Sequence, residues 1–268
     1  MKASVAATLL TMFAPHPLAA LPIDCLIEPR SMVRIAAAEE GRIEEVLVSR
    51  GDAIAAGDPL IRLDDQVQAL RAEIARARAG TDLDIRSGET RLELRREELA
   101  RAERLAERNV GALTSVDEAR IEVALTEIAI EEARLAAAQA AIEAQLTEEI
   151  LARRTVRAPL AGVVVAVEVS PGEYARREDE VLTLAIIDPL YVEVFASAAY
   201  FNRLDIGDTY MVSQTTPIVG SFKATVTVID QVFDAASNTF GVRLELPNPD
   251  GGIPAGTRCK VDFDAPSQ

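Results

Sequence analysis

Residues 41–63 read GRIEEVLVSRGDAIAAGDPLIRL, and residues 162–184 repeat this pattern as GVVVAVEVSPGEYARREDEVLTL. Aligned without gaps at an offset of 121, apolar residues meet apolar residues, and Gly51 meets Gly172. A repeat this short cannot bury its apolar face alone, so we expect the two copies to close on each other. The residues between them must then leave this small β module and return to it.

The residues between the two copies have the pattern of two long helices. Apolar residues recur every seven positions in both arms, which is the spacing of helices that pack as a coiled coil. Charged residues cover the other faces and leave one narrow stripe to bury. We therefore predict a projecting antiparallel hairpin over 64–157, with its turn at 109–115, rather than a compact bundle folded onto the β module. The stripe comprises Leu70, Ile74, Ala77, Ile85, Leu92, Leu99 and Ala106 in the first arm, and Ile121, Ile128, Leu135 and Ile142, with Leu125 and Leu146 beside them, in the second.

The first arm is interrupted at residues 79–88, AGTDLDIRSG. Gly80 and Gly88 each cost about 1 kcal/mol relative to Ala in a helix interior. The apolar stripe also jumps eleven residues there, from Ile74 to Ile85. We expect a local change in coiling or a flexible joint at this point.

Short alternating strands are predicted outside the hairpin. YVEVF, FKATVTVID and the stretch around Phe240 to Leu246 alternate apolar and polar residues, with turns between them, which fits a small β-barrel. The expected segments are a signal peptide (1–20), a lead-in contributing to the barrel (21–40), the first β half (41–63), the hairpin (64–157), the second β half (158–187) and the barrel (188–268).

The composition excludes several classes of function. The formal net charge is −15 and only three Lys occur, which argues against a nucleic-acid partner. The one His, His16, lies in the segment that we interpret as a leader, so imidazole bases and His-based metal sites are not expected. No Gly-rich phosphate loop is present. We therefore predict that the protein is not an enzyme and holds no cofactor or metal.

Residues 1–20 have the features of a secretory signal. Lys2 precedes a short apolar run, and Ala19-Ala20 offers a cleavage site before Leu21. The run is shorter than the roughly 20 residues needed to span a bilayer. The alternative is an N-terminal strand. We expect export, with association to a membrane only through partners.

The two cysteines, Cys25 and Cys259, lie far apart in the sequence. Cys259 belongs to an alternating stretch with Val261 and Phe263, so its side chain is predicted to point to a buried face. In an exported protein, an even pair favours a structural disulfide between the first and last strands. Two buried free thiols are the alternative.

The paired β halves resemble those of lipoyl and biotinyl carrier domains. In those domains a Lys between the halves carries the cofactor, whereas this junction reads Leu63-Asp64-Asp65, and no Lys occurs between Lys2 and Lys223. The resemblance implies the fold without the carrier chemistry. The predicted fold class is thus α+β: an elongated, modular protein with a coiled-coil α-hairpin inserted in a split lipoyl-like β-sandwich, plus a small β-barrel.

This arrangement resembles the periplasmic adaptor, or membrane fusion protein, family of the hemolysin-D type. The stretches that carry the resemblance are IEEVLVSRGDAIAAGDPLIRLDD (43–65), TVRAPLAGVVVAVEVSPGEY (155–174) and NTFGVRLELPNPDGGIPAGTRCKV (238–261). DCLIEP and TRCKV look like a small-adaptor subgroup with Cys at both places, which supports the disulfide.

The resemblance implies a subunit of a tripartite efflux or secretion system. Such adaptors form rings, often hexamers, that join an inner-membrane transporter to an outer-membrane duct in the Gram-negative periplasm. The transporter expected here is of the resistance-nodulation-division type, with the chain associated with the inner-membrane complex. The competing interpretation is an exported coiled-coil scaffold or regulator with no channel role.

The resemblance also implies a duct contact at the hairpin tip. The family motif has an Arg, a Leu four residues later, and a small polar residue near the turn. Arg101 and Leu105 match the first two, and the third position falls on Ala112, with Thr114 and Ser115 close by. Leu105 could equally be a residue of the hairpin core.

Many adaptors carry a further membrane-proximal β domain built from both termini. Only five residues follow Phe263, so the sequence predicts that this chain lacks that domain.

Overall fold

A computed structural model describes residues 22–108, 113–214 and 216–266. The chain divides into two units. The hairpin unit comprises Arg34–Thr183, and the sheet unit comprises the residues up to Val33 together with those from Leu184 onward. The predicted signal segment, 1–20, lies outside the described residues. Within the described ranges, no helix is both long enough and apolar enough to cross a membrane.

The two copies of the repeat pair with each other in the hairpin unit. Each copy contributes short strands: β2 (Gly41–Val46), β3 (Ala53–Ile54) and β4 (Pro59–Leu63) from the first, and β6 (Gly162–Val167) and β7 (Tyr174–Ala175) from the second. β2 pairs with β7 and β3 pairs with β6, both antiparallel. Strands of each copy therefore pair with strands of the other copy, as the repeat predicted.

The β core of the hairpin unit is apolar and closed by both copies. β5 (Thr155–Arg157) joins β4 in a four-stranded sheet of order β5-β4-β2-β7. The fully buried side chains come from corresponding strands of the two halves, because each strand turns one face inward. They are Ile43, Leu60, Ile61, Leu63, Val164, Val181 and Leu182.

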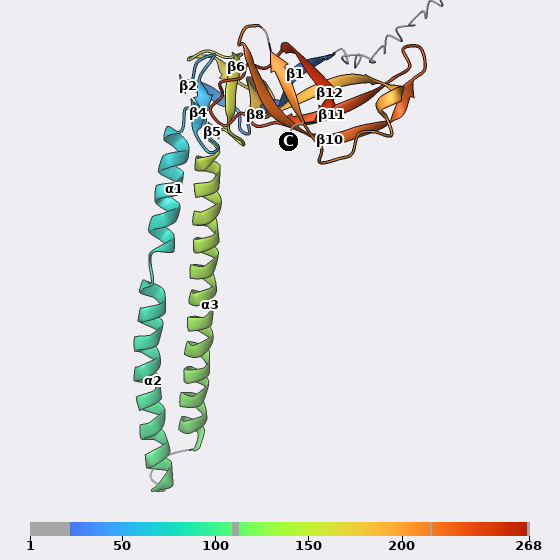
Figure 1. Ribbon diagram of the computed structural model, residues 1–268. Helices are drawn as coiled ribbons and strands as arrows, with labels where there is room; N and C mark the ends of the chain where they lie inside the picture. Colours follow the sequence, from blue (N-terminus) through green and yellow to red (C-terminus); the bar gives the residue numbers. More distant parts are fainter. Residues whose placement is uncertain (1–21, 109–112, 215, 267–268) are drawn as a thin grey trace, which may run out of the picture. The chain divides into compact units, whose positions relative to one another are not determined.

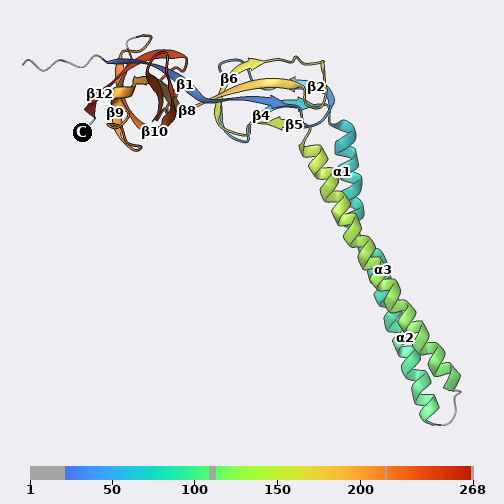
Figure 2. The ribbon, with the colours of Figure 1, turned by 90° about the vertical axis from the view of Figure 1, so that its right-hand side faces the viewer.

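Three helices separate the two copies. They are α1 (Gln66–Ala79), α2 (Leu83–Glu107) and α3 (Leu113–Ala152). α1 and α2 follow each other along one side of the uninterrupted α3, and the chain direction reverses between α2 and α3 (Figures 1 and 2). The predicted hairpin is therefore present, and the predicted joint is the break after Ala79. Gly88, in contrast, lies inside α2.

The sheet unit is a curled antiparallel sheet. Its strand order is β1-β12-β9-β10-β11-β8, and β1 also pairs with β8, so the order returns to its start. The described part of the chain thus confirms a mixed α+β protein with a helical hairpin and curled sheets. Bounds are β1 (Ile23–Ala36), β8 (Glu180–Ser197), a 3-10 turn η1 (Ala198–Tyr200), β9 (Thr209–Gln214), β10 (Gly220–Asp234), β11 (Thr239–Leu246) and β12 (Thr257–Pro266).

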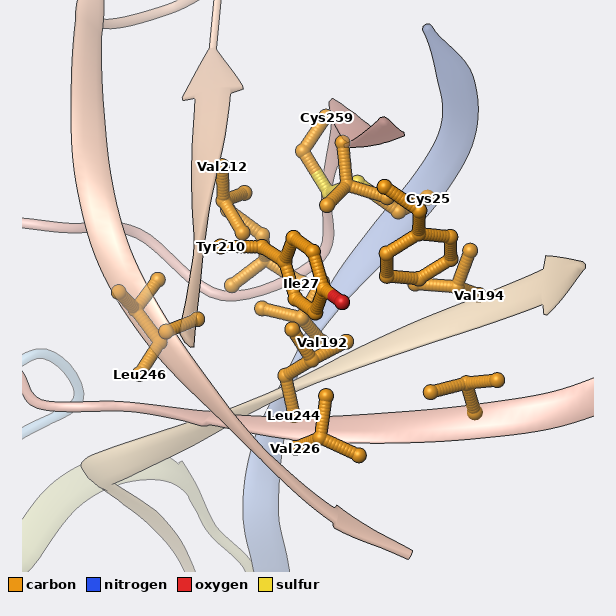
Figure 3. Close-up of a cluster of buried hydrophobic side chains, with 14 of the residues drawn as sticks. Cys25, Ile27, Val192, Val194, Tyr210, Val212, Val226, Leu244, Leu246 and Cys259 are labelled. Carbon is orange, nitrogen blue, oxygen red and sulfur yellow. A yellow bond between two sulfur atoms is a disulfide. The ribbon is translucent and has the colours of Figure 1, made fainter. Parts of the chain in front are cut away.

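Alternating side chains of these strands fill the interior of the sheet unit. Along β11, Phe240, Val242, Leu244 and Leu246 are buried and the residues between them are half-buried. Figure 3 shows Val192, Val194, Tyr210, Val212 and Val226 in the same cluster, with Cys25 and Cys259 at its edge. This burial is the main source of stability of the unit, because apolar area removed from water contributes about 25 cal/mol per Å².

Candidate interaction site: the helical hairpin

The root of the hairpin is fastened to the β module by Arg154. Its Nη1 donates to the carbonyl of Glu40 (2.9 Å), and its own carbonyl accepts the N–H of Leu63 (2.9 Å). A Cβ added at Gly41 would lie 2.6 Å from that Nη1, so glycine leaves the guanidinium its place. These contacts fix the position at which both arms of the hairpin leave the β module.

The two arms meet along small side chains. On α3 the buried and half-buried positions recur at alternating steps of three and four residues, the spacing of a coiled-coil contact. We call this set the inner seam: Val116, Ala119, Val123, Thr126, Ile130, Ala133, Ala137, Ala140, Ala144, Thr147 and Leu151. On the first arm the matching positions include Ala72, Ala75 and Ala79 in α1 and Ile85, Gly88, Leu92, Leu99, Ala102 and Ala106 in α2.

This seam corrects part of the sequence-based stripe. Ile85, Leu92, Leu99 and Ala106 are half-buried between the arms as expected. The second-arm stripe, however, points away from the first arm. Its residues are between half and two thirds exposed, as are Leu70 and Ile74: Ile121 58%, Leu125 55%, Ile128 55%, Leu135 60%, Ile142 66% and Leu146 59%.

The physical reason is that α3 carries two heptad stripes, one of small residues and one of large ones. Small residues let two helix backbones approach closely, and Gly88 provides the clearest case. A Cβ at Gly88 would lie 2.8 Å from Cγ1 of Ile130. Heptad spacing alone cannot tell which stripe faces the partner arm.

Ion pairs flank the inner seam and join the two arms, which fixes the register of one arm relative to the other. Glu89 Oε1 lies 3.2 Å from Arg134 Nη2, and Arg96 Nη2 lies 2.7 Å from Glu127 Oε1. Further along, Arg120 Nη2 lies 3.7 Å from Glu103 Oε1. These side chains are about half exposed, so each pair contributes at most about 1 kcal/mol, and their main effect is on register.

The predicted tip residues lie at the far end of the hairpin. Arg101 and Leu105 are on α2 and exposed, with Leu105 at 50%, while Thr114 and Ser115 are exposed on the first turn of α3. Ala112 lies outside the described residues. The exposure of Leu105 places it outside the inner seam. In the sequence, the motif spacing alone pointed to this end of the hairpin, and the duct contact stays a prediction.

Cys25 and Cys259 face each other directly in the β1–β12 ladder. Their Cα atoms are 4.8 Å apart and their sulfurs form a disulfide. A cross-strand pair at this separation is within the range that a disulfide spans. Both side chains are buried at the edge of the apolar cluster, consistent with a structural bond.

A polar cluster joins η1 to β12 in the sheet unit. The carboxylate of Asp264 accepts hydrogen bonds from Tyr200 Oη (2.7 Å) and from Arg203. These two bonds lower the pKa of Asp264, the Tyr200 bond more strongly. Burial and the nearby Asp208 raise the pKa of Tyr210 to about 12. Tyr210 Oη donates to Asp208 (3.3 Å), so these groups form two hydrogen-bonded sets, as expected for structural contacts. Among the described residues, no group of His, Cys, Asp and Glu is arranged to hold a metal ion.

A protein-family model described as "CzcB-like, barrel-sandwich hybrid domain" matches residues 31–186, more than half of the chain. The chain belongs to this CzcB-like family. It is thereby a membrane fusion, or periplasmic adaptor, protein, and proteins of this kind are non-enzymatic scaffolds. The family match confirms the resemblance found in the sequence.

Two known proteins are similar in sequence to this chain over much of its length. The cation efflux system protein CzcB of Alcaligenes sp. (strain CT14) is 26% identical over 179 residues, which is 67% of this chain and 34% of the relative. An uncharacterized protein of Haemophilus influenzae is 22% identical over 228 residues, which is 84% of this chain and 52% of the relative. The chain therefore spans about a third and about half of these relatives' lengths.

Solved structures of similar fold include two that cover nearly the whole chain. MacA from Actinobacillus actinomycetemcomitans has a TM-score of 0.72 at 17% identity, covering 92% of this chain and 79% of MacA. The membrane fusion protein Spr0693 from Streptococcus pneumoniae R6 has a TM-score of 0.59 at 17% identity, covering 91% of this chain and 98% of its own. At 17% sequence identity, these similarities show a shared fold only.

Proposed function

We propose that this protein is the periplasmic adaptor subunit of a tripartite efflux or secretion system. In this role it links an inner-membrane transporter, of the resistance-nodulation-division type, to an outer-membrane duct and helps to form a sealed conduit. The observation that carries the proposal is the long hairpin between the two paired copies of the β module, in a chain of the CzcB-like family. A rigid pair of helices rooted in one module is suited to reach a partner at a distance.

The proposal includes an interpretation of the β parts. The paired halves are a split lipoyl-like sandwich that holds the hairpin root, supported by the reciprocal β2–β7 and β3–β6 pairing. The curled sheet is the small β-barrel of adaptors, supported by its returning strand order. The segment boundaries 21–40, 41–63, 64–157, 158–187 and 188–268 belong to the same proposal.

The proposed partners follow from the proposed role. The protein is exported to the periplasm and joins the inner-membrane complex through its partners. It assembles as a ring, with six copies as the expected number. The tip residues Arg101, Leu105, Ala112, Thr114 and Ser115 contact the duct. Support for the last point is that Arg101 and Leu105 are exposed near the α2–α3 reversal and Arg101 has no ion-pair partner among the described residues.

Site-directed cross-linking in cells tests this function. Arg104→Cys places a thiol beside Arg101 and Leu105 without removing either, and it is exposed on α2. Arg71→Cys, exposed on α1 near the root, is the matched control. We expect a thiol-reactive cross-linker to capture an outer-membrane duct from position 104 and not from position 71. If no duct is captured from position 104, the adaptor role is wrong, and a scaffold without a channel role becomes the better description.

A further inference from the structure

The last strand of the sheet unit, β12, pairs unequally with its two neighbours. It pairs with β1 over five consecutive positions, Thr257–Val261 of β12 against Ile23–Ile27 of β1. Its pairing with β9 is regular at Lys260 and Val261, and the register then shifts before Pro266. β12 therefore relies on β1 for most of its regular backbone pairing.

The β1–β12 ladder closes the sheet unit, because β1 also pairs with β8 on its other side. Both strands contribute to the apolar cluster, and Ile27 of β1 and Val261 of β12 are fully buried. The ring of Phe263 packs against that of Tyr210, with 4.9 Å between the ring centroids. Opening this ladder would expose apolar surface to water, at a cost of about 25 cal/mol per Å².

The disulfide lies at the centre of the β1–β12 ladder. Cys25 pairs with Cys259, with two residue pairs of the ladder on either side. The bond joins positions 234 residues apart, and the sequence holds no other cysteine. The neighbouring ion pair between Asp24 and Lys260 is exposed and its atoms are 3.9 Å apart, so it adds little. Besides the backbone pairing, the disulfide is thus the strongest link between these two strands.

Both cysteines are buried in the closed sheet unit, where Cys25 is 7% exposed and Cys259 4%. Thiol–disulfide exchange needs an attacking thiolate to reach a sulfur atom directly. An outside thiol can therefore reach this bond only after the ladder opens locally. Before the ladder forms, both thiols are accessible. The bond is thus readily made before closure and is protected after it.

The position of the two cysteines in the chain separates them in time. Cys25 is in the first strand of the sheet unit and Cys259 in the last, so Cys25 is made long before its partner. Once β12 is complete, a small β-rich unit folds within about milliseconds to seconds. Disulfide formation takes about seconds to hours, depending on the oxidant. A fast oxidant is therefore needed to form the bond before closure buries two free thiols.

We propose that closure of the sheet unit is coupled to oxidation of Cys25 and Cys259 by a dithiol oxidant of the cell envelope, a protein with an oxidised Cys-x-x-Cys pair. The chain is then a substrate of that protein. A reduced chain keeps a folded hairpin beside a sheet unit that opens readily. This inference relies on the export that the proposed function includes, and it adds a partner to that function.

The reaction consists of two thiol–disulfide exchanges. The thiolate of Cys25 attacks the disulfide of the oxidant, which forms a mixed disulfide and releases one thiolate of the oxidant. The thiolate of Cys259 then attacks the sulfur of Cys25, which forms the Cys25–Cys259 bond and releases the second thiolate. The two cysteines lose two protons and two electrons, and the disulfide of the oxidant gains them.

The thiol state of the full-length protein in the cell envelope tests this proposal. Cells are quenched with acid, and free thiols are tagged with a maleimide that adds mass. We expect no tag on the natural protein in a normal host and two tags in a host that lacks its dithiol oxidant. Cystine added to the second host should remove both tags, because this small disulfide supplies the missing oxidant.

Single-cysteine variants test the order of attack. Cys259→Ala leaves Cys25 without its partner, so a mixed disulfide with the oxidant should accumulate as a larger band on a non-reducing gel. Cys25→Ala is the matched control and should accumulate less, because Cys259 becomes available only when the strands are complete. Cys25→Ala/Cys259→Ala should give no such band. More mixed disulfide from Cys25→Ala than from Cys259→Ala would contradict the proposed order.

Reduction of the purified full-length protein tests the protection of the bond. Dithiothreitol should reduce it at least about 100-fold more slowly in the folded protein than in urea, because local opening must come first. Similar rates in the two conditions would show that the bond is freely reversible and is not coupled to closure.

Capture of the duct from position 104, measured in the normal host, separates this inference from the adaptor role. Two results would refute the oxidation step alone if the duct is still captured: free thiols in the exported natural protein, or a bond that forms equally fast without the dithiol oxidant. A bond that forms as expected while no duct is captured refutes the adaptor role alone.

Discussion

In each copy of the repeat, one turn residue has a left-handed backbone conformation. It is glycine in the first copy but not in the second. Gly57 has φ of 88°, and the residue at the equivalent position in the second copy is Glu178, with φ of 72°. Left-handed backbone is natural for glycine but strained for glutamate, at a cost on the order of 1–3 kcal/mol. The N–H of Glu178 donates to the carbonyl of Ala37 (3.2 Å), but the exposed side chain makes no hydrogen bond or ion pair with the described residues that would offset this strain.

Replacing Glu178 with glycine should therefore stabilise the hairpin unit. We expect Glu178→Gly to raise the free energy of unfolding by about 0.5–1 kcal/mol, since the relieved strain exceeds the extra backbone entropy of glycine. Urea unfolding of the full chain measures this value. Gly57→Glu should lower it by about 1 kcal/mol, and Glu178→Ala should leave it nearly unchanged. A decrease for Glu178→Gly would show that the turn is not strained.

Tyr210 should make the sheet unit sensitive to alkaline pH. Its pKa is raised from 10 to about 12 in the folded protein, chiefly by burial. Between these values the unfolded chain loses the phenolic proton while the folded chain keeps it. Stability is then fully present below pH 10 and falls as the pH rises toward 12. Thermal unfolding of Tyr210→Phe should show a shallower loss above pH 10 than the natural protein. An equal loss of stability in both proteins above pH 10 would show that groups other than Tyr210 cause it.

At the scale of elements, the hairpin depends on which side chains lie between its arms. The large residues of α3 were expected there from their spacing, yet the structure uses mainly Ala, Thr and Val, with one Ile and Leu151, and Gly88 lies opposite Ile130. The spacing of the first-arm residues in α2 was sufficient, because Ile85, Leu92, Leu99 and Ala106 are the one series of apolar residues that repeats every seven positions across this helix. α3 has two, and the choice between them depends on how closely the helices approach.

Filling the space at Gly88 should open the hairpin. In Gly88→Leu the new side chain would meet Ile130, and we expect a loss of about 1–3 kcal/mol from overpacking. Hydrogen exchange of amides in α2 and α3 would report the loss as faster local opening. The double variant Gly88→Leu/Ile130→Ala should recover part of it, because the removed side chain makes room.

Gly80→Ala is the control, since Gly80 lies in the break between α1 and α2 and its added Cβ would come no closer than 3.4 Å to another atom. Equal losses at Gly80 and Gly88 would contradict a close-packed seam.

At the scale of the whole molecule, the described chain connects residues far apart in sequence through β1 and β12. The Cys25–Cys259 bond spans 234 residues and closes the first strand onto the last. A cross-link over so long a loop restricts the unfolded chain strongly, with a typical effect of about 2–5 kcal/mol.

Removing this bond should destabilise the sheet unit and leave the hairpin intact. We expect Cys25→Ala/Cys259→Ala to lower the unfolding free energy of the sheet unit by about 2–5 kcal/mol, with helix content at 222 nm unchanged at low temperature. Labelling of the natural protein under non-reducing, denaturing conditions checks the bond itself. Two freely labelled thiols would show that the cysteines are not bridged in solution.

The sequence by itself determined the paired repeat, the hairpin between its copies, the break near Gly80 and the family. These depend on local periodicity and on residue types whose spacing is visible in one dimension. The tertiary structure alone decided which stripe of α3 faces the first arm, which charges remain unpaired on its outer side, and how Cys25 comes to lie opposite Cys259. Those features depend on distances between side chains far apart in the chain, and packing selects among patterns that local spacing leaves equivalent.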